Sequence, residues 1–153
     1  MRPVLLEGEG PEGLWAGLAE QVGAAGYRLE RRSCHPANGS THFRERVVAV
    51  DPELSEAQAA KTLCHELAHV LLHDATRVTE ARDLAEVEAE SVAFIVCHAA
   101  GMTTGDYSLP YVARWSGGDP AAVRARAERV VDASRSILDA LAGAQSDATA
   151  VSA

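Results

Sequence analysis

The sequence predicts an α+β domain: a small mixed sheet of about three strands, packed on a helix with a His-Glu-x-x-His pattern, with two or three further helices. Apolar residues recur at helical spacing in four segments. One stretch ending in Val47–Val50 alternates and is rich in β-branched residues, as strands are. A chain of 153 residues, 47% of them hydrophobic, is long enough to bury the core of one such domain.

The first half of the chain predicts one helix and the strands. Residues 1–12 are rich in Gly, Glu and Pro and are expected to form a lead-in segment. Apolar spacing predicts a helix over Leu14 to Ala25, with Gly26 as its end. Tyr27 to Arg32 is a short strand candidate, and Thr41 to Val50 is the best strand candidate of the chain. The residues between them contain Pro, Asn and Gly, which are typical of turns.

The second half of the chain predicts three helices. Ser55 is expected to cap a helix over Glu56 to His73, with Gln58 completing a capping box. A polar link leads to a helix over Arg82 to Ala100. Asp119-Pro120 is a helix start with proline at the first helical position.

The last of these helices sets the expected end of the domain. Its apolar face continues to about Leu141, and Gly143 follows. The domain is therefore expected over residues 13–142, and residues 143–153 are expected to form a flexible tail because they are small and polar.

Charge and hydropathy exclude several classes of partner. Fourteen basic residues against 22 acidic ones give a net charge of −8, so direct nucleic-acid binding is not expected. No apolar run approaches the roughly 20 residues of a membrane helix, and the N-terminus does not resemble a secretory signal. We expect a cytoplasmic protein without a membrane partner.

The segment that carries chemistry is His65-Glu66-Leu67-Ala68-His69. Residues four apart on a helix project from one face, so the two imidazoles can reach one tetrahedral Zn²⁺. Glu66 lies beside them as a general base for a water molecule. The pattern predicts one zinc ion per chain, held by His65 and His69.

A third protein ligand must come from elsewhere. The position at which metzincins carry a histidine is Ala75, and His73 lies about 12 Å along the axis from the first motif histidine, so neither fits. We assign His73 to the helix end, where an imidazolium suits the helix dipole. Helical phase places Glu88 on the apolar stripe of the next helix, so Glu88 is the preferred ligand and Glu90 the alternative. Glu86 and Glu90 are expected to form a solvated acidic flank.

These motifs resemble the ImmA/IrrE family of metallopeptidases. Residues 61–73, Lys-Thr-Leu-Cys-His-Glu-Leu-Ala-His-Val-Leu-Leu-His, and residues 86–94, Glu-Val-Glu-Ala-Glu-Ser-Val-Ala-Phe, carry the resemblance. The chain is most similar to the metallopeptidase region of actinobacterial ArdC-like antirestriction proteins, and residues 107–115 also resemble that subgroup. In the family, the third ligand is the glutamate of a Glu-Ala-Asn motif. Glu88-Ala89 matches that motif, with Glu90 in place of Asn.

The resemblance covers roughly residues 12–142 and implies a minimal gluzincin-like zinc endopeptidase. Its substrate would be a protein, with a transcriptional repressor as a candidate, and DNA binding is not expected. Glu66 would activate water and then protonate the leaving amine. The strand Arg46 to Val50 is a candidate edge for an extended substrate. Tyr107, Tyr111 and His98 are candidates for stabilising the oxyanion.

Two alternatives stay open. One is an interaction module that keeps zinc for stability and cuts nothing, against which the intact Glu66 argues. The other is a zinc hydrolase acting on a non-peptide bond, because the same constellation serves other hydrolyses. A narrow cleft, rather than an open strand edge, would favour that second alternative.

Overall fold

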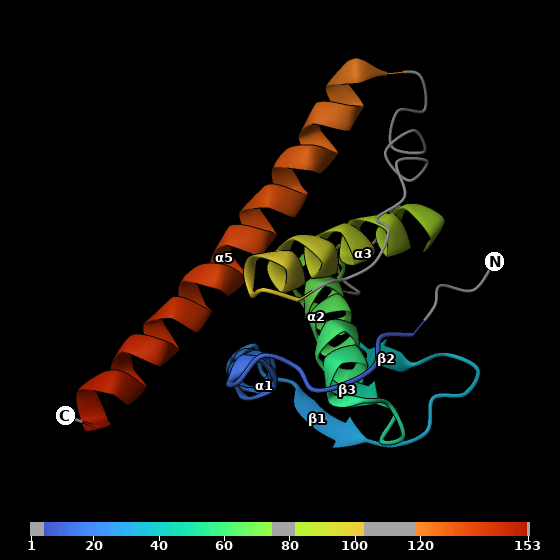
Figure 1. Cartoon of the computed structure of the whole chain (residues 1–153). Helices are drawn as coiled ribbons and strands as arrows, with labels where there is room; N and C mark the ends of the chain where they lie inside the picture. The colour runs from blue at the N-terminus through green and yellow to red at the C-terminus, as the bar shows by residue number, and fades with distance from the viewer. Residues whose placement is uncertain (1–4, 75–81, 103–118, 153) are drawn as a thin grey trace.

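The computed structural model describes residues 5–74, 82–102 and 119–152, and within them it has the predicted α+β fold (Figure 1). The described residues form a three-stranded mixed sheet and four helices. In chain order the elements are α1 (Leu14–Ala24), β1 (Arg28–Arg31), β2 (Gly39–His42), β3 (Val47–Val50), α2 (Glu56–Leu72), α3 (Arg82–Ala99) and α5 (Pro120–Ser152).

The sheet has the order β1-β3-β2, with β1 parallel and β2 antiparallel to β3. All four residues of β3 are buried, as expected for a central strand made of Val and Ala. The predicted single strand over Thr41 to Val50 is two strands, because the chain turns between His42 and Val47, with Arg46 at φ 57°. The prediction that Arg46 to Val50 offers an edge is wrong, since β3 is paired on both sides. The edge next to α2 belongs to β2.

Local signals set the helix ends. Gly26 follows α1 at φ 86°, and the Ser55 hydroxyl accepts a hydrogen bond from the Gln58 amide at 3.1 Å. The reciprocal half of the capping box is absent. The Gln58 side chain instead accepts from the Leu6 amide at 2.9 Å, which ties the lead-in segment to the start of α2. At the other end of the chain, α5 continues through Gly143 to Ser152, further than the sequence pattern predicts.

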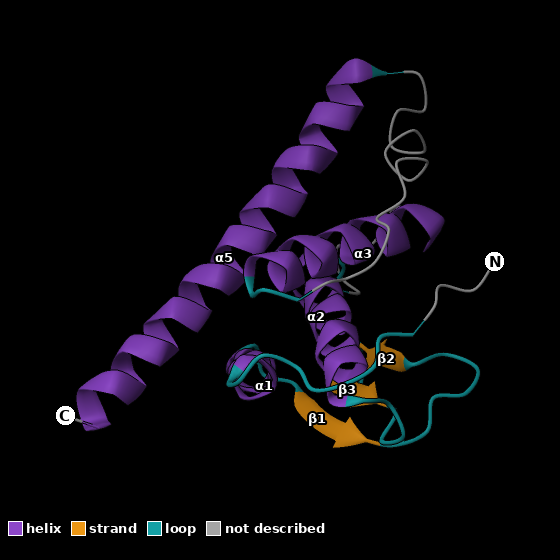
Figure 2. Ribbon diagram, in the orientation of Figure 1, coloured by secondary structure: helices purple, strands orange, loops and turns teal. Residues whose placement is uncertain are grey.

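Helix α2 is the central element. It contacts the sheet, α1, α3 and α5, while α5 lies across α3 and extends past the other helices (Figures 1 and 2). Burial of each large apolar side chain between these layers contributes about 1.5–3 kcal/mol relative to exposure. The largest fully buried apolar side chains are Leu18, Val22, Val48, Val50, Leu63, Leu67, Val92, Val96, Val130 and Ile137.

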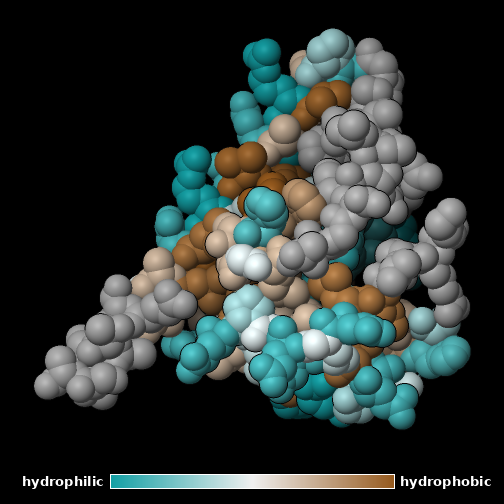
Figure 3. Space-filling view, in the orientation of Figure 1, coloured by the Kyte–Doolittle hydropathy of each residue, from teal (hydrophilic) through white to brown (hydrophobic). Residues whose placement is uncertain are grey.

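The surface follows the same organisation. In the space-filling view, hydrophobic residues gather where α5 lies against the other helices, and hydrophilic residues cover the end that carries the sheet (Figure 3). None of the helices in the described ranges combines the length and apolar character needed to cross a membrane.

Candidate metal centre

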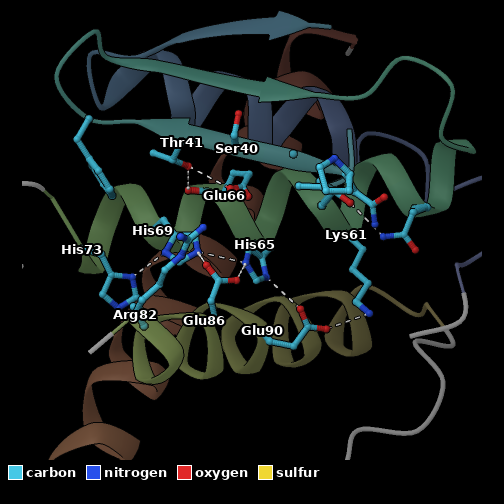
Figure 4. A pocket seen from close by; sticks show the side chains of 18 of the residues that line it. Ser40, Thr41, Lys61, His65, Glu66, His69, His73, Arg82, Glu86 and Glu90 are labelled. Carbon is cyan, nitrogen blue, oxygen red and sulfur yellow. Dashed lines mark hydrogen bonds and ion pairs between the residues drawn. The ribbon is translucent and has the colours of Figure 1, made fainter. Parts of the chain in front are cut away.

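The His-Glu-x-x-His residues lie in the middle of α2 and point to two different sides (Figure 4). His65 and His69, one turn apart, face α3, and their ring nitrogens Nε2 lie 3.2 Å from each other. Glu66 points toward β2 and is buried, with 5% of its surface exposed. The motif therefore places two nitrogen donors and one carboxylate on the wall of one cavity.

Glu86 of α3 completes a group that can hold a metal ion with His65 and His69. Its two oxygens lie 3.1 Å from His65 Nε2 and 3.0 Å from His69 Nε2. A zinc ion with ligands at 2.0–2.1 Å in a tetrahedron has ligand-to-ligand distances of about 3.3 Å. One donor atom from each of the three residues lies within 4.8 Å of the other two, which is compact enough for one ion, and the chemistry of the donors suits zinc.

His65 has a second carboxylate partner on its other ring nitrogen. Its Nδ1–H donates to Glu90 Oε2 at 3.0 Å, and Glu90 Oε1 pairs with Lys61 Nζ at 3.1 Å. A carboxylate behind a metal-binding histidine fixes the orientation of the ring. Glu90, the alternative third ligand of the sequence prediction, takes this supporting position instead. The predicted solvated flank is partly wrong: Glu86 is exposed, but both it and Glu90 contact His65.

Glu88 is where helical phase places it, fully buried in the core, yet the structure does not bring it to the His65–His69 pair. Its Oε1 accepts from His73 Nε2–H at 3.0 Å, and His73 Nδ1 lies 2.9 Å from His69 Nδ1. His73 lies at the end of α2, as predicted, as the residue that follows its last turn, and it is buried, with 4% of its surface exposed.

The electrostatics of the group favour positive charge. Burial lowers the pKa of His65, but hydrogen bonds with Glu86 and Glu90 outweigh it and raise this pKa to about 10. Contacts with His65 and His69 hold the pKa of Glu86 well below its usual range. For Glu90, burial raises the pKa, while His65 and Lys61 lower it to about 2 overall. The same arrangement that holds protons between rings and carboxylates suits a metal cation.

Glu66 lies in a setting suited to a base. Burial raises its pKa, and the nearby His65 and His69 oppose that change. The Thr41 hydroxyl of β2 lies 3.3 Å from Glu66 Oε1 and 3.3 Å from the Glu66 carbonyl oxygen. Gly39 permits this approach of β2 to α2, because a Cβ there would lie 3.2 Å from Glu66 Cγ.

The cavity has a volume of about 800 Å³ and is bounded by β2 with its preceding loop, α2 and the first half of α3. His98 does not line it; this side chain is exposed and stacks on Phe94. Two other oxyanion candidates, Tyr107 and Tyr111, lie outside the described residues. Sequence reasoning placed Glu86 on a solvated flank and so missed its contacts with the two histidines, although one signal was present: Glu86 and Glu90 are spaced four apart, as are His65 and His69.

A helix with His-Glu-x-x-His, facing a carboxylate on the next helix and an edge strand on its other side, has the arrangement of a metallopeptidase. The comparison with known families agrees, because residues 20–109 match the IrrE N-terminal-like domain, peptidase family M78. The chain belongs to this metallopeptidase family.

Similarity to individual proteins is more limited. Over 70 residues, 45% of this chain, the sequence is 34% identical to an uncharacterized protein of Bacillus anthracis. The matched stretch spans only 12% of that protein's length. No solved structure matches the chain.

Proposed function

We propose that the chain is a zinc-dependent endopeptidase in which His65, His69 and Glu86 hold the ion and Glu66 is the general base. The observation that carries the proposal is the group of donor atoms from His65, His69 and Glu86, all within 4.8 Å of one another, on the cavity wall that also bears the buried Glu66 carboxylate. Family membership supports zinc as the metal and peptide hydrolysis as the reaction.

The residues have separate tasks in this reaction. When bound, zinc supplies a Lewis acid that makes water more acidic and polarises a peptide carbonyl. Glu66 accepts a proton from the attacking water on its carboxylate and delivers it to the leaving amine nitrogen. Burial suits Glu66 to this task, because a raised pKa makes its carboxylate a stronger base. Thr41 holds the carboxylate in place.

A peptide is favoured as substrate by the position of β2. Within the described residues β2 pairs with β3 alone, and Gly39, Ser40 and Thr41 of β2 line the cavity. An extended peptide can add to such an edge through main-chain hydrogen bonds, with the scissile bond beside α2. This edge replaces the one expected at β3 and favours an endopeptidase over a hydrolase of small molecules.

The substrate class follows from the resemblance to ArdC-like and ImmA/IrrE proteins. On that basis we propose a protein substrate, with a transcriptional repressor as the first candidate.

The test combines metal analysis with a cleavage screen. Zinc-loaded protein is incubated with a library of peptides derived from a bacterial proteome, and new termini are identified by mass spectrometry. Glu66→Gln keeps the three donors and removes the base, so it should retain zinc and produce no new termini. Cleavage by the wild type alone supports the proposal. A wild type that holds zinc but yields the same termini as Glu66→Gln would contradict it and favour the interaction module.

A further inference from the structure

A buried row of polar side chains extends from the metal centre into the core. It starts at His69, passes through His73 and Glu88, and ends at the guanidinium groups of Arg126 and Arg129 on α5. His73 is 4% and Glu88 0% exposed. Burying a carboxylate this completely is costly unless charged partners and hydrogen bonds compensate it. Packing alone does not account for these polar side chains, because apolar residues would fill the same space without this cost.

The hydrogen-bond directions along the row are mutually consistent. If the lone pair of His69 Nε2 faces Glu86 and the ion, then its proton lies on Nδ1. That N–H donates to His73 Nδ1 at 2.9 Å, which leaves the proton of His73 on Nε2. His73 Nε2–H then donates to Glu88 Oε1 at 3.0 Å. Each neutral ring has one N–H donor and one nitrogen acceptor. With the protons placed in this way, both rings use both groups, and the lone pair of His69 Nε2 stays free for the metal.

At the far end of the row, two guanidinium groups of α5 face the Glu88 carboxylate. Arg129 Nε lies 3.2 Å from Glu88 Oε2, and Arg126 Nη1 lies 3.6 Å from Oε1. Arg129 also donates through Nη2 to the Leu72 carbonyl at 3.2 Å, near the end of α2. Helix α5 is therefore connected both to the helix that bears the histidines and to the carboxylate that orders them.

We propose that His73 and Glu88 are positioning residues that hold the His69 ring with Nε2 toward the metal, and that Arg129 anchors them to α5. The inference rests on the proposed function, since it takes His69 as a ligand. It gives Glu88 a defined task although Glu88 does not contact the ion. Each of the two histidines then has its own pair of supporting residues. Glu90 with Lys61 orients His65, and His73 with Glu88 orients His69.

The experiment measures zinc affinity of the full chain by competition with a chromophoric chelator, and the visible absorption of the Co²⁺-substituted protein. His73→Leu can neither accept from His69 nor donate to Glu88. His73→Gln can do both through its amide. We expect His73→Leu to bind zinc 10- to 100-fold more weakly and to alter the Co²⁺ bands, as loss of a ligand's hydrogen-bond partner does elsewhere. His73→Gln should restore affinity to within about threefold of wild type.

Ser134→Ala is the matched control, because Ser134 is a buried polar residue of α5 outside the row, bonded to the Val130 carbonyl. It should leave affinity and spectrum unchanged. If His73→Leu fails to fold by circular dichroism, Glu88→Gln replaces it, and we expect up to about tenfold weaker zinc binding because a neutral acceptor remains.

Wild-type affinity and Co²⁺ bands in the folded variant would overturn the inference, as would a His73→Gln protein as weak as His73→Leu. If Glu86→Gln still loses zinc in either case, the proposed function stands without the positioning row. A wild type that binds no zinc would overturn both.

Discussion

The substitution Glu86→Gln tests the assignment of the third zinc ligand most directly. Glu86 supplies the only carboxylate among the three donors, with oxygens 3.0 and 3.1 Å from the two imidazole Nε2 atoms. A carboxylate ligand lies about 2.0–2.2 Å from zinc, closer than these distances to the rings. Loss of a partner behind a metal ligand already costs about 10- to 100-fold in affinity, so loss of a charged ligand itself should cost at least about 100-fold. This corresponds to about 3 kcal/mol, a moderate value that fits a side chain 52% exposed to solvent.

The assay is zinc content by mass spectrometry, together with chelator competition, on wild type and four carboxylate variants prepared side by side, Glu86→Gln, Glu88→Gln, Glu90→Gln and Glu128→Gln. Wild type should hold about one zinc per chain, and Glu86→Gln should lose it on dialysis. Glu90→Gln should keep zinc with affinity reduced about tenfold, since Glu90 acts only through the His65 ring. Glu128→Gln removes an exposed carboxylate of α5 and controls for the change in net charge.

The refuting results are specific. Full zinc affinity in Glu86→Gln would show that the carboxylate is not a ligand, whatever its distance from the rings. Complete loss of zinc in folded Glu88→Gln would restore the choice made from helical phase. The second outcome would also remove the basis for treating Glu88 as a supporting residue.

The remaining predictions concern stability. In Gly39→Ala, the new Cβ would lie 2.7 Å from Thr62 Cγ2, so we expect 1–3 kcal/mol of destabilisation in urea unfolding, and no loss of stability would contradict the close packing. Arg129→Met removes a cationic partner of the fully buried Glu88 carboxylate and should cost about 2–3 kcal/mol, whereas Arg28→Met breaks only an exposed pair and should cost under about 1 kcal/mol. Equal effects would refute the distinction. Chelation with EDTA should lower the melting temperature of zinc-loaded wild type, because free zinc at about 100 times Kd stabilises by about 2.7 kcal/mol. The same treatment should leave Glu86→Gln unchanged; a shift there would mean that the ion binds elsewhere.

The sequence predicts most helix ends because they carry local chemistry, although α5 continues past Gly143 to Ser152. Ser55 caps α2, Gly26 follows α1, and Asp119 accepts a hydrogen bond from the Ala121 amide at the start of α5. The turn between β2 and β3 was missed because residues 43–46, Phe-Arg-Glu-Arg, lack the Gly, Pro or Asn that mark most turns. Arg46 adopts the left-handed conformation and donates to the Ala25 and Gly26 carbonyls, a long-range contact that no local pattern reveals.

The sequence predicts the part of the site that lies on one helix, because residue spacing within a helix determines which side chains are neighbours. Spacing alone puts His65, Glu66 and His69 on α2, and all three line the cavity. The carboxylate from α3 depends on how two helices meet, which the apolar stripe of one helix does not determine. Helical phase identified the most buried glutamate. The proposed ligand, Glu86, is the more exposed of the two glutamates and lies on the cavity wall.

Burial and reactivity therefore separate the two carboxylates of α3. Glu86 lies at the cavity wall, where an ion can enter and leave and where solvent weakens its charge. Glu88 is fully buried between α2, α3 and α5, where its carboxylate contacts the His73 and Arg129 side chains and not solvent. A fully buried carboxylate cannot contact substrate or solvent. It can still hold a histidine ring in one orientation through a hydrogen bond, because its own position is fixed by the surrounding helices. Since its counter-charge comes from α5, loosening that helix should weaken zinc binding without altering any residue of the cavity.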